Sequence, residues 1–280
     1  MLKITLSALS LSLLGITTGF SQPTKIDIQK GQKYQVETTN KTTSSAEVMG
    51  QTMETLIDSK SISLIEVMNN NPEGTDLQAT ATKVLLTSSM MGQDMSFDSD
   101  KQDNEGPMAE GLSKLLNKPR AISIDNKGTI TKQEVIESDM QTILTGNNAE
   151  LSKTTELFIP SLIGKELKAG DSINDIASLA KEKYSSRDSG TYRITKIENG
   201  VASITYTGTQ YITTVMEQMG MEMNMIINST VKTELQVDMK TGIVLLKSSE
   251  LDTNTTVDAG GMTIPATGKT TTTIKITPAS

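Results

Sequence analysis

Residues 219–228, MGMEMNMIIN, place a methionine or an isoleucine at every second position. The odd-numbered positions hold the apolar side chains Met219, Met221, Met223, Met225 and Ile227, and the even-numbered positions are mostly polar. Because neighbouring side chains of a β-strand point to opposite faces, a period of two predicts an extended strand with one apolar face.

Alternation of the same kind recurs along most of the chain. Segments rich in threonine, serine, valine and isoleucine predict strands over 33–40, 61–69, 76–90, 190–198, 201–215, 228–238, 242–253 and 269–277. Turn sequences that end in glycine separate some of them, at 126–128, 198–200 and 240–242. The predicted fold class is mainly β (α+β), a curved antiparallel sheet or partial barrel with a few short helices.

Helical spacing is confined to the middle of the chain. In GPMAEGLSKLLNKP (106–119) apolar residues recur at three- and four-residue intervals between two prolines, which predicts a helix. Weaker helical patterns cover 137–144, 148–160 and 172–184.

Two stretches outside this middle region resemble each other, AISIDNKGTITK (121–132) and ELQVDMKTGIVLLK (234–247). In each stretch, alternating apolar and polar residues lead to an aspartate, a turn with a lysine and a glycine follows, and a second predicted strand comes after the turn. They indicate two similar halves, which form either one compact domain or two pseudo-repeats. The expected organisation is a signal peptide (1–21), an N-terminal β-rich half (22–136), a helical or loop connector (137–185) and a C-terminal β-rich half (186–280).

The first residues have the features of a secretory signal peptide. Lys3 precedes an apolar run over 4–16, and the small residues Gly19 and Ser21 suit the −3 and −1 positions of a cleavage site after Ser21. The apolar run is shorter than the ~20 residues of a spanning helix, and no later run is long and apolar enough to span a bilayer. We expect an exported protein, periplasmic or extracellular, without an integral membrane segment after cleavage.

The composition excludes several classes of function. The chain has no histidine and no cysteine, so Ser-His and Cys-His catalytic pairs are excluded. The formal net charge is −7 and no arginine-rich patch exists, which argues against a nucleic-acid partner. We expect a protein that is not an enzyme and has no cofactor; its protein partners are not indicated.

The phrase M-G-x-x-M occurs at 49–53, 91–95 and 219–223. On a strand, the methionines of each phrase share a face. The glycine of each phrase is expected to mark a β-bulge or a close backbone crossing. The candidate ligand-lining residues are Met49, Met53, Met91, Met95, Phe97, Met219, Met221, Met223 and Met225.

These methionines have three interpretations. Methionine is flexible and fills irregular gaps in a core, and the same softness suits the wall of a cavity for an apolar ligand. Thioether sulfurs also suit Cu(I), but alternate residues of a strand lie ~7 Å apart and would not converge on an ion. No metal site is predicted on other residues.

The order of a signal peptide, a long hairpin, M-G-Q phrases, ISIDNKGTI (122–130) and FIPSLIGKELKAGDSI (158–173) resembles an uncharacterised family of exported β-rich proteins widespread in the Bacteroidota. That family, a domain of unknown function, implies no activity or site residues. The expected curved sheet with helices on its concave side is also similar to the bacterial lipoprotein-carrier and lipoprotein-localisation folds, which hold acyl chains.

The working hypothesis is non-catalytic binding of an apolar or lipid-like ligand, a hydrophobic small molecule or a lipid, in the cell envelope. The alternative is a structural or protein-interaction module with a filled core and no ligand. Methionine-based binding of Cu(I) is the third hypothesis.

Overall fold

The structure, a computed structural model, describes residues 23–48, 50–90, 92–101, 104, 106–134, 154–218 and 221–279. Strands make up most of these ranges, which confirms the mainly β fold class. The elements are β1 (Lys33–Val48), β2 (Gln51–Asn71), β3 (Gly74–Met90), β4 (Gln93–Asp98), α1 (Pro107–Ser113), β5 (Pro119–Ile124), β6 (Ile130–Gln133), β7 (Ser172–Lys181), β8 (Tyr184–Glu198), β9 (Val201–Gln218), β10 (Met221–Asp238), β11 (Val244–Ala259) and β12 (Met262–Ala279).

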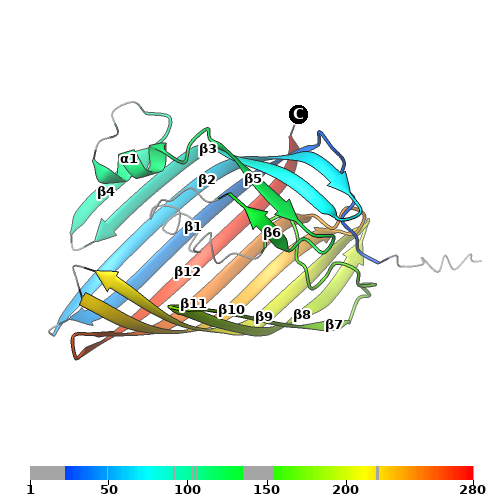
Figure 1. The fold of residues 1–280 in the computed structure, drawn as a ribbon. Coiled ribbons are helices and arrows are strands. Elements are labelled where there is room, and N and C mark those ends of the chain that lie inside the picture. The colour runs from blue at the N-terminus through cyan, green and yellow to red at the C-terminus, as the bar shows by residue number, and fades with distance from the viewer. Residues whose placement is uncertain are drawn as a thin grey trace, which may run out of the picture.

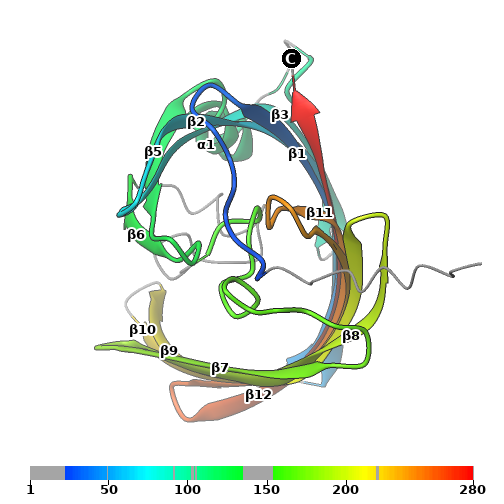
Figure 2. The same ribbon diagram turned by 90° about the vertical axis from the view of Figure 1, so that its right-hand side faces the viewer.

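All these strands form one antiparallel sheet. Its order is β6-β5-β3-β2-β1-β12-β11-β10-β9-β8-β7, and β4 pairs with β3 beside that path. The first and last strands, β1 and β12, pair in the middle and join the two halves (Figure 1). The view along the strands shows that the sheet curves strongly (Figure 2), and no pairing of β6 with β7 closes it within the described residues. The fold is an open, curved sheet.

The curvature gives the sheet a concave and a convex face, and the two-residue alternation assigns each side chain to one of them. Along β11, from Leu251 to Ala259, half-buried and exposed residues alternate without interruption. In β3 an extra residue at Thr82 shifts the pairing, so that Leu77 before it and Leu86 after it are both buried on the concave side. The bulge therefore preserves a single apolar face along a long strand.

The main hydrophobic core fills the concave face at one end of the sheet, which we call the core end. Two segments, 23–32 and 154–171, cross this end inside the curve (Figure 2), and we call them the inserted segments. They bury Ile28, Leu157, Phe158, Leu162 and Leu167 among the strand side chains. Backbone hydrogen bonds join them, since the Thr24 N–H donates to the Lys165 carbonyl (2.8 Å) and the Gly164 N–H donates to the Thr24 carbonyl (2.6 Å).

Two hairpins at the core end, β5–β6 and β10–β11, share one turn structure. In each, the Oδ1 atom of an aspartate, Asp125 or Asp238, accepts two backbone hydrogen bonds from the turn. A glycine at positive φ, Gly128 or Gly242, follows in each turn. The turns predicted at 126–128 and 240–242 are confirmed, and the similarity between 121–132 and 234–247 corresponds to this shared local structure.

Only part of the helical prediction is confirmed. Residues 107–113 form α1, which packs Leu112 and Leu115 against Leu86 and Phe97 in a second, smaller apolar cluster. The helix predicted over 137–144 lies outside the described residues, as does the first part of 148–160. From residue 154 to residue 160 the described chain is not helical.

The helix predicted over 172–184 is wrong, because residues Ser172–Lys181 form β7. The apolar spacing of Ile173, Ile176 and Leu179 suits a helix, but β7 pairs with β8 along its whole length. Tertiary pairing thus overrides a weak local pattern. The connector expected over 137–185 accordingly contains an edge strand of the sheet.

The glycines of two M-G phrases, Gly50 and Gly92, lie in two-residue hairpin connections. Val48 pairs with Gln51, and Met90 pairs with Gln93. Gly50 and Gly92 have φ values of 77° and 75°, and no atom lies within 4 Å of where their Cβ would be. The expectation of a bulge or a close backbone crossing is therefore wrong at these positions, since positive φ is what a tight hairpin turn requires. We call this end of the sheet the turn end.

Candidate ligand-binding site on the concave face

The concave face changes its chemistry between the core end and the turn end. Cross-strand pairs in register arrange its inward side chains in rows, so each row can be followed from strand to strand. Beyond the core lie a polar zone and then an apolar zone, and these two zones form the candidate site.

The polar zone lies on the four central strands, and we call it the hydroxyl belt. It consists of Asn40, Thr42, Ser229, Thr233, Ser249, Thr253, Thr270 and Thr272. Its side chains form cross-strand hydrogen bonds in the pairs Thr272–Asn40 (2.7 Å), Thr233–Ser249 (2.9 Å), Thr42–Thr270 (3.0 Å) and Ser229–Thr253 (3.1 Å). These bonds satisfy part of the polar capacity of the belt and leave hydroxyl lone pairs and protons for further partners.

The apolar zone lies between the belt and the turn end, and we call it the apolar band. Its members are half-buried, and none belongs to either buried core cluster. Met53 faces Ala46 on β1, and Ala46 faces Ala266 on β12. The band consists of Ala46, Val48, Met53, Ile212, Met223, Met225, Ile227, Val257, Ala259, Ile264 and Ala266.

The structure places three of the predicted methionines in the apolar band. Met223 and Met225 alternate on β10 with the exposed Glu222 and Asn224, and Met53 lies on β2. Three strands, β1, β12 and β11, lie between Met53 and the β10 methionines. The methionines therefore do not form one contiguous wall; alanine, valine and isoleucine side chains connect them.

The other predicted residues have different surroundings. Met95 on β4 is 41% exposed, and Phe97 is buried against α1 rather than on an open surface. Met49, Met91 and Met219 lie outside the described residues, as does the side chain of Met221. Successive inward residues of one strand, such as Met223 and Met225, lie ~7 Å apart, so their sulfurs do not converge in the manner of a Cu(I) site.

A single lysine, Lys247, lies on the concave face of β11 where the core meets the hydroxyl belt. Its cross-strand neighbours Leu235 and Ile274 are both buried. Burial lowers the pKa of Lys247, and the negative charge of Glu156 on an inserted segment opposes this shift. Arg120 on β5 is affected in the same sense, because burial lowers its pKa while Glu156 and Glu134 oppose the change.

The wing formed by β7, β8 and β9 carries a carboxylate on its concave side. Burial raises the pKa of Asp188, a hydrogen bond from Gln210 Nε2 (2.8 Å) opposes this, and the charge of Asp175 adds to it. Nearby, the rings of Tyr192 and Tyr206 have centroids 4.6 Å apart. The Tyr206 ring occupies the space that side chains at Gly190 and Gly208 would need.

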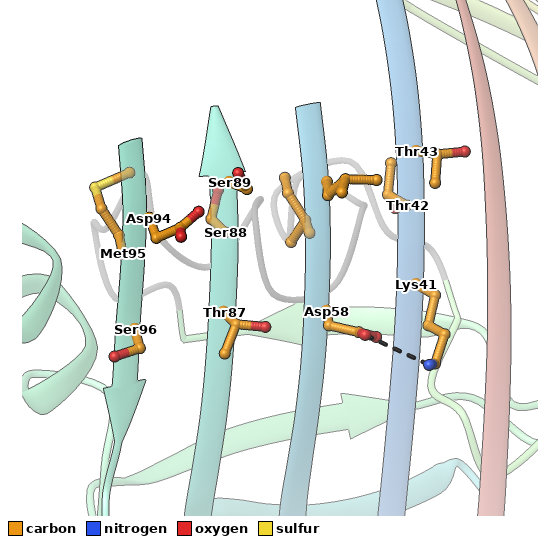
Figure 3. Close-up of a pocket in the computed structure, with 12 residues that line it drawn as sticks. Lys41, Thr42, Thr43, Asp58, Thr87, Ser88, Ser89, Asp94, Met95 and Ser96 are labelled. Carbon is orange, nitrogen blue, oxygen red and sulfur yellow. Dashed lines mark ion pairs between the residues drawn. The ribbon is translucent and has the colours of Figure 1, made fainter. Parts of the chain in front are cut away.

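The convex face carries a shallow depression of about 510 Å³ over β1–β4. Figure 3 shows these strands side by side, with an ion pair between Lys41 and Asp58 (3.4 Å). The cross-strand row formed by Lys41, Asp58, Thr87 and Ser96 is exposed along its whole length. The depression also exposes Leu56 (52%). Its lining is confined to β1–β4, whereas the apolar side chains of the concave face extend from β2 to β9, so the concave face is the better candidate.

Neither the hydroxyl belt nor Lys247 was predicted from the sequence. In the segment GIVLLKSSELDT (242–253), Lys247 is separated from Leu245 and Leu251 by an even number of positions. On a strand these three side chains point to the same face, and this spacing could have placed Lys247 on the apolar face. The belt has a weaker signal, because alternating serine and threonine also occur on the convex face.

Comparisons with known proteins identify no family. No family model matches the chain, and no curated protein matches it. Among solved structures, a lipovitellin studied for its lipid–protein interactions is 11% identical with a TM-score of 0.46, over 91% of this chain and 26% of that one. This chain thus spans about a quarter of the length of that protein.

Two bacterial proteins are also similar. An outer membrane channel from Pseudomonas putida F1 is 7% identical (TM-score 0.26; 90% of this chain, 97% of that one), and OccK7 (OpdD) from Pseudomonas aeruginosa is 8% identical (0.29; 90%, 100%). At these values no function and no residue role is transferred. The resemblances to the Bacteroidota family and to the lipoprotein carriers stay predictions.

No helix among the described residues is long and apolar enough to cross a membrane. No group of three or more acidic, histidine or cysteine side chains in the described ranges could hold a metal ion.

Proposed function

We propose that this protein is an exported β protein without catalytic activity that binds an apolar or lipid-like ligand on its concave face. The observation that carries the proposal is the apolar band, a continuous set of half-buried aliphatic and methionine side chains that belongs to neither core cluster. Covering such surface is favourable by ~25 cal/mol for each Å² removed from water.

The contrast between the two faces of the same strands supports the concave side. On β11 the inward residues Val257 and Ala259 alternate with the outward Thr256 and Asp258. The convex side therefore already suits water, whereas the concave side gains from an apolar occupant. Within the described residues β6 and β7 do not pair, so the sheet itself does not enclose the concave face.

Two features of the sequence support the remaining parts of the proposal. The signal-like residues 1–21 support export to the cell envelope. The absence of histidine and cysteine removes the commonest general base and the commonest thiol nucleophile, which supports a role in binding.

Binding of N-phenyl-1-naphthylamine, a neutral apolar fluorophore, tests the proposal. We expect a saturable rise in its fluorescence with the purified protein. Val257→Asp should weaken binding at least about tenfold, because it places a carboxylate in the band. Thr256→Asp is the matched control, since it adds the same charge to the exposed convex side of the same strand.

The circular dichroism spectrum and thermal unfolding of both variants show whether each is folded. Ala266→Leu, which enlarges an apolar side chain of the band without adding charge, is a second variant that should alter affinity while remaining folded. No saturable binding by the folded wild-type protein, or equal binding by Val257→Asp and Thr256→Asp, would overturn the proposal.

A further inference from the structure

Lys247 lacks a polar partner in the described part of the chain. No hydrogen bond or ion pair joins it to a described residue, and Glu156 acts on it only from beyond ion-pair distance. Lysines on the convex face differ, since Lys269 pairs with Glu250 (3.6 Å) and Lys60 pairs with Glu37 (2.6 Å). Lys247 is thus a cation on the concave face that no anion among the described residues pairs with.

The hydroxyl belt begins next to this lysine. Ser249 lies two residues further along β11 on the same face. Its cross-strand neighbours are Thr233 on β10 and Thr272 on β12, which also belong to the belt. Lysine ammonium groups and hydroxyls all donate hydrogen bonds to anionic oxygens, and bonds to a charged acceptor are roughly twice as strong as neutral ones. A cation beside a row of hydroxyls is a suitable surface for a carboxylate or phosphate group.

The apolar band lies on the far side of the belt from Lys247. From Ser249 to Thr255, where the rows of the band begin, the strand runs six residues, or ~20 Å. The concave face therefore presents, in order, a cation, a zone of mostly hydroxyl side chains that also contains Leu251 and Val231, and an apolar surface. That order matches the charged head, the linkage region and the hydrocarbon tail of an amphiphile.

We propose that the ligand is an anionic amphiphile whose carboxylate or phosphate head lies at Lys247 and the hydroxyl belt and whose tail lies over the apolar band. This inference rests on the proposed function and adds the charge and orientation of the ligand. The low pKa caused by burial supports it, because a lysine that loses hydration without gaining an anion destabilises the folded protein and gains when an anion binds.

Displacement of N-phenyl-1-naphthylamine by four compounds tests the inference: tetracosanoate, tetracosyl phosphate and methyl tetracosanoate, whose chains are long enough to reach the band from Lys247, and inorganic phosphate without a tail. Wild-type protein should bind one or both long-chain anions at least about tenfold more tightly than the methyl ester, a difference of ~1.4 kcal/mol. Which anion binds better identifies the head group. Inorganic phosphate should not compete at concentrations at which the amphiphiles saturate the protein.

The same series with substituted proteins assigns the preference to Lys247. Lys247→Met should keep fluorophore binding and lose the preference for anions over the ester, while Lys247→Arg should retain it. Lys269→Met, which removes a convex lysine, is the matched control and should behave as wild type. Lys247→Met with an unchanged preference, or wild type that binds ester and anions equally, would overturn this inference and leave the proposed function standing. If the wild-type protein does not bind the fluorophore, both the proposed function and this inference are wrong. If inorganic phosphate alone displaces the fluorophore, the ligand is not an amphiphile.

Discussion

Gly128 in the β5–β6 turn lies against Phe158 of an inserted segment so closely that a Cβ on Gly128 would be 2.8 Å from the Phe158 Cβ. The backbone of Gly128 also has a φ of 85°. Gly128→Ala therefore adds left-handed strain to a steric clash, and we expect it to lower the free energy of unfolding by roughly 2–5 kcal/mol. Urea denaturation followed by circular dichroism measures this loss.

Gly200→Ala is the control for backbone strain alone. Gly200 has a φ of 79°, but no atom lies within 4 Å of where its Cβ would be. This substitution should cost about 1–2 kcal/mol. Equal losses in the two variants would show that Phe158 moves aside without cost and that the inserted segment is loosely packed.

Asp188→Asn should stabilise the protein at neutral pH. Because the pKa of Asp188 is raised on folding, mainly by burial, the folded state binds a proton more readily than the unfolded state. In wild type this group therefore adds stability as the pH falls through the raised folded pKa, and it costs stability above that pH. Asparagine still accepts the hydrogen bond from Gln210 and carries no charge.

Unfolding free energies between pH 3 and pH 8 check this expectation. The Asp188→Asn curve should lie above wild type at pH 7 and approach it in acid. Asp252→Asn, on the exposed convex face of β11, controls for the loss of one negative charge from the whole protein. A wild-type curve that lies above Asp188→Asn at pH 7 would contradict the sign of the shift.

Thr155→Val should also stabilise the protein. The Thr155 hydroxyl is buried in an inserted segment and has no hydrogen-bond partner among the residues that the structure describes. Valine keeps the branched shape and removes the unsatisfied group, so we expect a gain of about 1–3 kcal/mol. Thr273→Val, at an exposed position of β12, should change stability by less than about 0.5 kcal/mol, and thermal unfolding compares the two.

Lys247→Met should raise stability in the absence of ligand. The pKa of Lys247 is lowered on folding by burial, so the unfolded state binds a proton more readily and the charged lysine disfavours the folded state at neutral pH. The difference between variant and wild type should shrink as the pH rises through the folded and then the unfolded pKa of the lysine. A less stable Lys247→Met protein at pH 7 would instead indicate a structural role for the ammonium group.

The sequence predicted local structure well where alternation was long. Residues 221–238 alternate over most of their length, and β10 with its half-buried Met223 and Met225 follows that pattern. The last strand was predicted over 269–277, which is too short, because β12 begins at Met262 and includes Pro265. Proline removes one donor from a ladder, and a long pairing with β1 and β11 tolerates that loss.

Strand order could not be predicted in the same way. Periodicity states which side chains share a face of one strand, but not how far apart two strands lie in a sheet. For that reason the sequence could not show that β1, β12 and β11 separate the methionines of β2 from those of β10. The same limit hid the relation between Lys247 and the hydroxyl belt, which depends on cross-strand register.

The pairing of β1 with β12 also governs how the chain assembles. Lys33 faces Ala279, and the ladder continues to Ala46 and Ala266, so β12, which follows all the other strands in sequence, completes the centre of the sheet. The strands on either side of this seam can form hairpins from neighbours in sequence, but the seam itself must wait for a contact between strands far apart in sequence, which slows folding. A circular permutant that joins residue 279 to residue 23 through a flexible linker and opens the β8–β9 turn would bring β12 and β1 close in sequence and keep the inserted segment 23–32, and it should fold faster than the natural order.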